Sequence, residues 1–239
     1  TRVEIKGVSH NSWIPELTHN ESFRQWALLH IREELLKRFP DFSGWKMEHK
    51  QLRSLNTTYQ PVNDAFSSGN VVVVVKLAGF SGILSHFTQP TKSFNDEISD
   101  RLKVIACIEK PNMTSSEDPN EKIPFEVWQE LAKETGAGEN DALVLFWGPE
   151  NDMKTALEVI EERCLMAFKG VPNETRKSFG DGTTIFERVL PGADRMYPDT
   201  DSKPIPLENQ YIQQLASDLP SEVMERYHQM KNWNIPEDT

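Results

Sequence analysis

The sequence predicts an α+β protein, and three observations lead to this prediction. Residues 71–77 and 142–147 are continuous apolar stretches rich in β-branched and aromatic residues, which is typical of strands buried on both faces. Residues 124–135 and 152–168 carry apolar residues at helical spacing, so amphipathic helices are expected there. The order helix, turn, strand, helix indicates an α+β or α/β sandwich.

The remaining elements follow from apolar periodicity and from the breakers between segments. A short strand is expected at residues 3–8, and a helix at residues 20–39, which Asn20 can cap and Pro40 ends. Residues 41–60 are polar and are expected to form an irregular boundary. Beyond the first valine-rich strand, the pattern predicts a helix at 94–103, a strand at 104–108, a loop at 113–120, a helix opened by Pro124, a tight turn at 136–140, a strand at 183–190 and two short helices at 208–218 and 221–233.

Composition limits the possible functions. The 239 residues are enough for one large domain or two ordinary ones, and no apolar run is long enough to span a bilayer. The formal net charge of -11 argues against a module that holds nucleic acid mainly through its phosphates. Cations gather between residues 24 and 53, whereas acids dominate residues 117–141, so any contact with nucleic acid is expected to be local.

Several common sites are disfavoured by spacing. Cys107 and Cys164 lie far apart without ligand-spaced neighbours, which argues against a disulfide scaffold and against zinc. None of the six histidines forms a His-x-x-x-His pair, and no serine or cysteine has the flanks of a nucleophile elbow. Ser81-Gly82 follows a strand but lacks the fingerprint of a phosphate loop. We expect a cytoplasmic protein, and because Thr1 is not an initiator residue, we expect a fragment of a longer chain.

The residues with most chemical potential lie in segment 181–201. Its first half alternates as a strand, and a Pro-Gly turn then leads to Arg195, Tyr197, Asp199 and Asp201. If this stretch is extended, the four side chains project to one face. A cation, a phenol and two carboxylates on one face are typical of a nucleotide–magnesium site. A polar edge strand with surface ion pairs is the alternative, and composition alone favours it.

Four ordered motifs resemble one family. They are Val3-Glu-Ile-Lys-Gly-Val8 with Ile14-Pro15 and Arg24-Gln25 behind it, Val75-Lys-Leu-Ala-Gly-Phe-Ser-Gly-Ile-Leu84, Gly136-Ala-Gly-Glu-Asn-Asp-Ala-Leu-Val-Leu145, and Asp181-Gly-Thr-Thr184 with Leu190-Pro-Gly-Ala-Asp-Arg-Met-Tyr-Pro-Asp-Thr-Asp201. The first and last resemble parts of the catalytic cradle in the E subunit of the archaeal-type glutamyl-tRNA(Gln) amidotransferase. The middle two are similar to the insert of that protein, the GAD domain, which it shares with bacterial aspartyl-tRNA synthetases.

This resemblance implies a domain layout and an activity. Residues 1–60 would be part of the cradle, 61–178 a GAD-like insert, 179–207 the return to the cradle, and 208–239 the start of a helical region. The family uses ATP and Mg²⁺ to phosphorylate the glutamate carried by tRNA(Gln), and ammonia from a partner amidase then displaces the phosphate. The expected partners are Glu-tRNA(Gln) and that amidase, with no membrane and no DNA.

The resemblance also implies residue roles. Asp199, Asp201 and Glu4 are candidates for the metal, Lys6, Arg188 and Arg195 for phosphate or carboxylate contacts, and Tyr197 for the substrate or adenine. Asp199 stands where family members carry glutamate and is one methylene shorter. The first half of the cradle is missing from this sequence, so the fragment is expected to be inactive alone.

Two other functions remain open. One is a non-catalytic tRNA-binding or scaffolding module. The other is a fragment of an aspartyl-tRNA synthetase, against which stands the absence of class II motif context around the insert.

Overall fold

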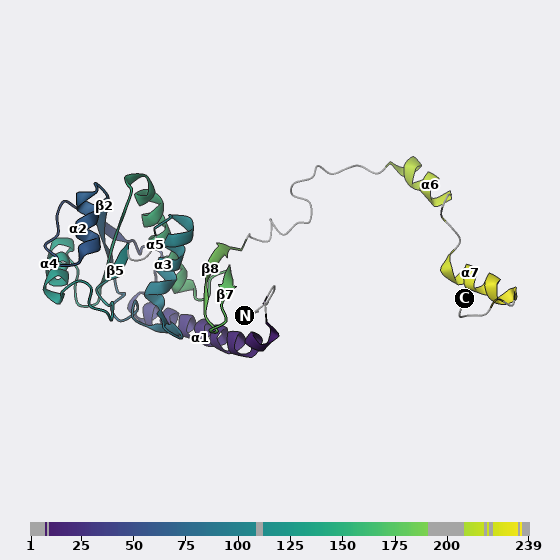
Figure 1. Ribbon diagram of the computed structural model, residues 1–239, viewed down its shortest axis with the longest axis horizontal. Helices are drawn as coiled ribbons and strands as arrows, with labels where there is room; N and C mark the ends of the chain where they lie inside the picture. The colour runs from purple at the N-terminus through teal and green to yellow at the C-terminus, as the bar shows by residue number, and fades with distance from the viewer. Residues whose placement is uncertain are drawn as a thin grey trace. The chain divides into compact units, whose positions relative to one another are not determined.

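The computed structural model describes residues 8, 10–108, 112–190, 208–217, 219, 222–233 and 235 (Figure 1). The chain divides into two compact units, Thr1–Leu190 and Pro191–Thr239, which are described separately. No helix among the described residues combines the length and the apolar character needed to cross a membrane. Helices and antiparallel sheets make up the first unit, so the predicted α+β class is confirmed.

A four-stranded antiparallel sheet forms the centre of the first unit. Its strands run in the order β1 (Glu48–Leu52), β2 (Val71–Leu77), β6 (Ala142–Gly148) and β5 (Met113–Ser115). The two central strands pair along their whole length, with Val74 opposite Leu145.

Helices cover both faces of this sheet. Helices α1 (Ile14–Arg38), α3 (Phe94–Ile105) and α5 (Glu150–Lys169) pack on one face, and α2 (Gln60–Ser67) and α4 (Phe125–Thr135) on the other. Figure 1 shows α2 and α4 on one side of the strands and α3 and α5 on the opposite side. Alternate valines of β2 therefore enter different cores: Val73 and Val75 face the first group of helices, whereas Val72 and Val74 face the second. This two-sided burial explains the continuous valine run.

Two glycines hold backbone positions that a side chain would disturb. Gly136 ends α4 in the left-handed conformation, at φ 65°, so the predicted turn after this helix is confirmed. Gly79, at φ 74°, follows β2 beneath the ring of Phe39, and a Cβ there would collide with that ring.

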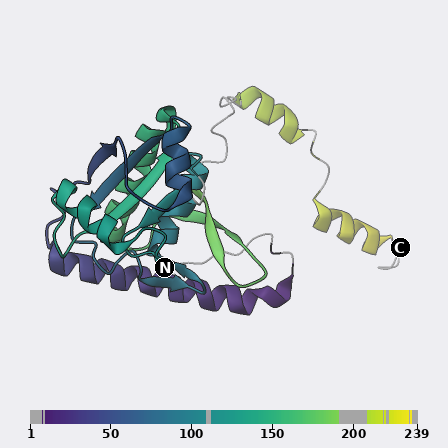
Figure 2. The same cartoon turned by 60° about the vertical axis from the view of Figure 1, so that its left-hand side comes forward.

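A two-stranded hairpin, β7 (Glu174–Ser178) and β8 (Thr184–Val189), follows α5. Figure 2 shows this hairpin beside α1, and its tip is tied there because Asn20 Nδ2 donates to Gly182 O at 2.9 Å. A smaller pair, β3 (Phe87–Gln89) and β4 (Lys92–Ser93), precedes α3, and a 3-10 turn, η1 (Asn11–Trp13), precedes α1.

The second unit contributes two described helices, α6 (Asn209–Ser217) and α7 (Val223–Asn232). All their described side chains are exposed, including the apolar residues Tyr211, Leu215 and Met224. The prediction of two short helices on either side of Pro220 is confirmed.

Four predicted details are wrong. The first helix begins at Ile14 rather than at Asn20, because Pro15 fits its first turn and Asn20 is used for the hairpin contact instead of a cap. The supposedly irregular residues 41–60 contain β1, and the predicted loop at 113–120 begins with β5. The expected strand at 104–108 does not form, because α3 continues to Ile105.

The predicted strand at residues 3–8 lies almost wholly outside the described residues. The assignment of residue ranges to cradle and insert stays a prediction. Helix α1 and strand β1, which fall in the predicted cradle range, share the core and the sheet of the predicted insert.

Candidate functional site

Of the predicted site residues, the structure describes Arg188. The others, namely Glu4, Lys6, Arg195, Tyr197, Asp199 and Asp201, lie outside the described residues. Among the residues that are described, no group of three or more His, Cys, Asp or Glu side chains is arranged to hold a metal ion.

Arg188 lies near the end of β8. Its carbonyl accepts a hydrogen bond from Thr175 Oγ1 at 3.4 Å across the hairpin, and its exposed guanidinium pairs with none of the described residues. Two residues earlier on the same strand, Phe186 is fully buried, so the strand is fixed just before Arg188. In the sequence, the predicted site residues Arg195, Tyr197, Asp199 and Asp201 follow shortly after Leu190.

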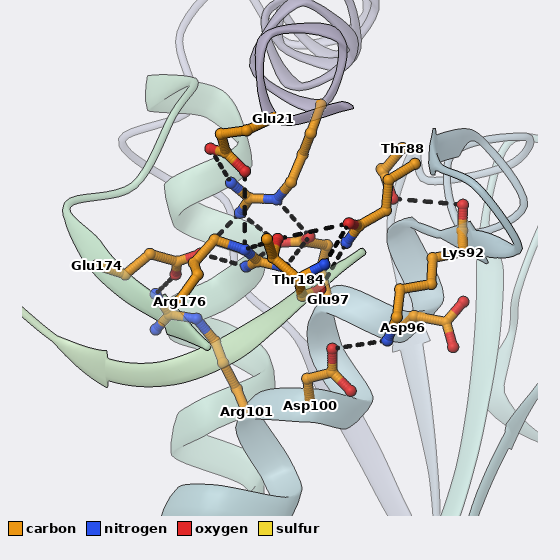
Figure 3. Close-up of polar contacts among 12 residues, drawn as sticks. Glu21, Thr88, Lys92, Asp96, Glu97, Asp100, Arg101, Glu174, Arg176 and Thr184 are labelled. Atoms are coloured by element: carbon orange, nitrogen blue, oxygen red, sulfur yellow. Dashed lines mark hydrogen bonds and ion pairs between the residues drawn. The ribbon is translucent and has the colours of Figure 1, made fainter. Parts of the chain in front are cut away.

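A buried cluster of charged side chains fixes this hairpin to three helices (Figure 3). We call it the arginine–glutamate cluster; its members are Glu21 and Arg24 of α1, Glu97 and Arg101 of α3, Arg163 of α5, and Glu174 and Arg176 of β7. All four arginines and both of the central glutamates have side chains at most 8% exposed.

Glu97 is the carboxylate on which the helices converge. Arg24 binds it through two parallel hydrogen bonds, from Nε to Oε1 at 2.7 Å and from Nη2 to Oε2 at 2.8 Å. This fork geometry is the strongest arginine–carboxylate arrangement. Arg163 Nη2 donates to Oε2 at 3.3 Å, and Arg176 Nη2 lies 3.3 Å from Oε1. One carboxylate thus joins α1, α3, α5 and β7.

Glu174 ties the hairpin to the same cluster. It accepts hydrogen bonds from Arg24 Nη2 at 2.7 Å, from Arg101 Nη2 at 2.7 Å and from Arg176 Nη1 at 2.6 Å. Arg176 also donates to Thr184 on the facing strand, through Nε at 2.8 Å and Nη2 at 3.0 Å. Because both strands are bound, the hairpin cannot slide along α1 without breaking several buried charged hydrogen bonds.

A glutamine makes a second attachment beside the cluster. Gln89 of β3 donates through Nε2 to Thr184 O at 2.7 Å and accepts the Thr184 N–H at 2.8 Å. Its side-chain amide therefore pairs with β8 as another strand would, and it satisfies backbone groups that are buried there.

The cluster holds one more cation than carboxylates. The half-exposed Glu162, at 3.9 Å from Arg101 Nη1, supplies the nearest further anion. Arg163 is the least satisfied member, because its Nε and Nη1 have no hydrogen-bond partner among the described residues. Its guanidinium lies instead 4.5 Å from the centre of the Phe94 ring, in a cation–π contact.

These surroundings lower the pKa values of two glutamates and one arginine, for different reasons. Burial opposes the charge of Glu97, yet Arg176 and Arg24 outweigh it and hold the pKa of Glu97 well below its usual range. The pKa of Glu174 is lowered against burial by Arg24 and Arg176. Burial lowers the pKa of Arg163, and Glu97 only partly compensates.

These shifts predict a loss of stability in acid. Because the folded-state pKa values of Glu97 and Glu174 lie below the ordinary 4.5, their stabilisation is fully present above about pH 4.5 and is lost as the pH falls through the lower folded values. We expect the free energy of unfolding, measured by urea titration, to fall as the pH drops below about 4.5. The slope should be shallower for Glu174→Gln; equal slopes would mean that this carboxylate is not linked to acid unfolding.

Chemically, this cluster is a clamp. Each central carboxylate is occupied by two or more arginines, so neither is available to bind a metal or to accept a proton from a substrate. The sequence pattern did not indicate that these residues form a buried cluster. One feature of the sequence could have revealed them, namely charged residues at positions that helical spacing turns toward the core. Glu97 and Arg101 lie on the buried side of α3 together with Phe94, Ile98 and Leu102.

The fold and the cluster define an α+β protein in which a charged interior holds one hairpin in place. Comparisons with curated proteins identify its relatives. The chain is 38% identical over 224 residues to the E subunit of glutamyl-tRNA(Gln) amidotransferase from Sulfolobus acidocaldarius, an alignment that covers 92% of this chain and 35% of the relative. The proteins of the same name from Methanopyrus kandleri and Methanocaldococcus jannaschii are each 35% identical, over 93% and 96% of this chain. No family model matches.

The chain therefore belongs to the family of this E subunit, and the resemblance seen in its motifs is confirmed. It spans about a third of the length of the relatives that it matches.

Proposed function

We propose that the parent of this chain takes part in converting Glu-tRNA(Gln) to Gln-tRNA(Gln). The observation that carries the proposal is identity of 35–38% to three proteins named for this amidotransferase, extending over more than nine-tenths of the chain. In this proposal ATP and Mg²⁺ activate the glutamyl carboxylate as an acyl phosphate, and ammonia from a partner amidase displaces the phosphate.

The proposed site consists of the residues that the family motifs imply. Glu4, Asp199 and Asp201 would hold Mg²⁺, because magnesium prefers carboxylate oxygens. Lys6, Arg188 and Arg195 would neutralise the negative charge of the transferring group, and Tyr197 would contact the substrate or adenine.

Arg188 is the described residue against which this proposal can be checked. Its guanidinium is exposed and makes no ion pair with the described residues, whereas Arg176 on the facing strand is consumed by Glu97 and Glu174. A free guanidinium on a fixed strand fits bidentate recognition of a phosphate or carboxylate. The arginine–glutamate cluster would then position Arg188 through the hairpin.

We expect Arg188→Ala to lower kcat/KM for Gln-tRNA formation by about 100- to 1000-fold in the full-length parent, which is the usual range for removing one charge-stabilising group. The assay supplies Glu-tRNA(Gln), ATP, Mg²⁺ and the amidase partner, and separates the two aminoacyl-tRNAs. Arg188→Lys should recover part of the loss. Lys177→Ala, which removes an exposed cation from the same hairpin, is the matched control and should leave the rate unchanged.

The possible outcomes test the role of Arg188 and the proposed amidotransferase function separately. If the parent forms Gln-tRNA and Arg188→Ala has no effect, Arg188 is not in the site. If the complete parent binds tRNA but forms no Gln-tRNA with ATP and an ammonia source, the non-catalytic tRNA-binding alternative replaces the proposal.

A further inference from the structure

Five aromatic rings meet on the surface of the first unit, and none of them belongs to the arginine–glutamate cluster. We call them the ring cluster; its members are Phe23, Trp26 and His30 of α1, with His86 and Phe87 at the start of β3. Neighbouring centroids lie 5.4–5.7 Å apart, from Phe87 to Phe23, Phe23 to Trp26, Trp26 to His30 and His30 to His86. Such spacing is that of favourable aromatic pairs.

Two side chains of the ring cluster, Trp26 and Phe87, are largely exposed to solvent. Trp26 is 57% exposed and Phe87 is 49% exposed, and Leu29 next to them on α1 is 40% exposed. The helical pattern places Trp26 beside the buried face of α1, yet its ring lies outside the core. Exposed aromatic groups that are held together on two elements are typical of interaction sites rather than of ordinary surface.

The charges around the ring cluster indicate the chemistry of its partner. Two arginines of α1 are engaged elsewhere: Arg24 is in the arginine–glutamate cluster, and Arg38 donates to Ser81 O at 2.7 Å. The third, Arg32, is exposed and lies beside Gly170. Glu33, by contrast, stands one helical turn after His30 on the same side of α1 and is exposed. A cation that approaches the ring cluster would meet π-faces and a carboxylate.

We propose that the ring cluster is a docking surface for a protein segment that carries arginine, with a guanidinium lying over the indole of Trp26. Tryptophan offers the best π-face for a cation, and the chain's net charge of -11 favours approach of a basic partner. This proposal does not depend on the amidotransferase activity, since it concerns a different surface and a different ligand.

The experiment titrates the 239-residue chain with a tetra-arginine peptide and follows the indole N–H resonances by NMR. The Trp26 resonance is assigned from Trp26→Phe. We expect it to shift and saturate, and we expect Trp26→Leu to weaken peptide binding about fivefold, the usual size of one cation–π contact. Phe125→Leu is the matched control, because Phe125 is 71% exposed on α4 and its loss should leave binding unchanged.

Three outcomes would overturn the proposal. Equal effects of Trp26→Leu and Phe125→Leu would show only general attraction of the peptide to an acidic chain. A saturating shift of Trp26 by a single-stranded RNA oligonucleotide, with none by the peptide, would make the ring cluster a base-stacking surface. No shift by either probe would mean that arginine does not dock there.

Discussion

Replacing Glu97 by glutamine is expected to lower the free energy of unfolding by about 3–5 kcal/mol, because it removes the carboxylate around which three buried arginines are arranged. An amide keeps the size of the side chain but offers one acceptor oxygen and no charge. Arg24, Arg163 and Arg176 would then face one another with Glu174 as their main remaining counter-ion. Urea unfolding of the chain, followed by tryptophan fluorescence, measures the change.

Two further variants make this experiment specific. Glu158→Gln alters an exposed carboxylate on α5 that lies 3.9 Å from Lys154, and should change stability by less than about 1 kcal/mol. Arg163→Met removes the member that makes one long hydrogen bond and leaves two nitrogens unpartnered, so it should cost far less than Glu97→Gln. If Glu97→Gln were as mild as Glu158→Gln, the cluster would not hold the fold together.

Asp201→Asn is expected to abolish Gln-tRNA formation by the full-length parent, a loss of at least about 100-fold. The reason is that asparagine lacks the negative charge of a proposed magnesium ligand, and even groups that merely orient such ligands cost about 10- to 100-fold when removed. Affinity for tRNA should stay within about twofold, because the substitution alters the reaction site and not the bulk of the tRNA contact. Aminoacyl-tRNA separation measures the first quantity and filter binding the second.

Glu130→Gln, an exposed acid on α4, controls for a general effect of removing negative charge. Activity retained in Asp201→Asn would remove this residue from the proposed site. If Asp201→Asn lost both activity and tRNA affinity, the cause would be a defect in folding or in tRNA binding. The proposed role of Asp201 as a magnesium ligand would then be rejected.

The sequence predicted well those elements whose apolar residues face a core, because the apolar pattern then shows both the type of element and its buried side. The valine run of β2 and the amphipathic face of α5 are examples, and Met153, Ile160 and Cys164 are buried as predicted. Strand β1 was missed because an edge strand with an exposed face needs few apolar residues, and four of its five residues are exposed. The false strand at 104–108 arose from Val104 and Ile105, β-branched residues that end α3 and remain exposed.

The arginine–glutamate cluster was not foreseen for a different reason. Arg24, Glu97 and Glu174 are far apart in the sequence and meet only through tertiary packing. Local propensity treats each of them as a surface residue. Of the predicted reaction site, the sequence placed Arg188 on a strand, which the structure confirms; the roles of that site's residues stay predictions.

The run of five valines in β2 has a consequence for how the sheet finds its alignment. If β2 shifted by two residues along β6, valine would replace valine at several core positions, so the alignments differ mainly at the ends of the valine run. A shift would bring either Asn70 to the buried position of Val72 or Lys76 to the buried position of Val74. Just after the strand, the Gly79 N–H donates at 2.9 Å to Asp141, the residue that precedes β6, and this contact adds to the distinction. The polar residues that flank the valine run thus fix the register of a strand whose own side chains hardly differ from one another.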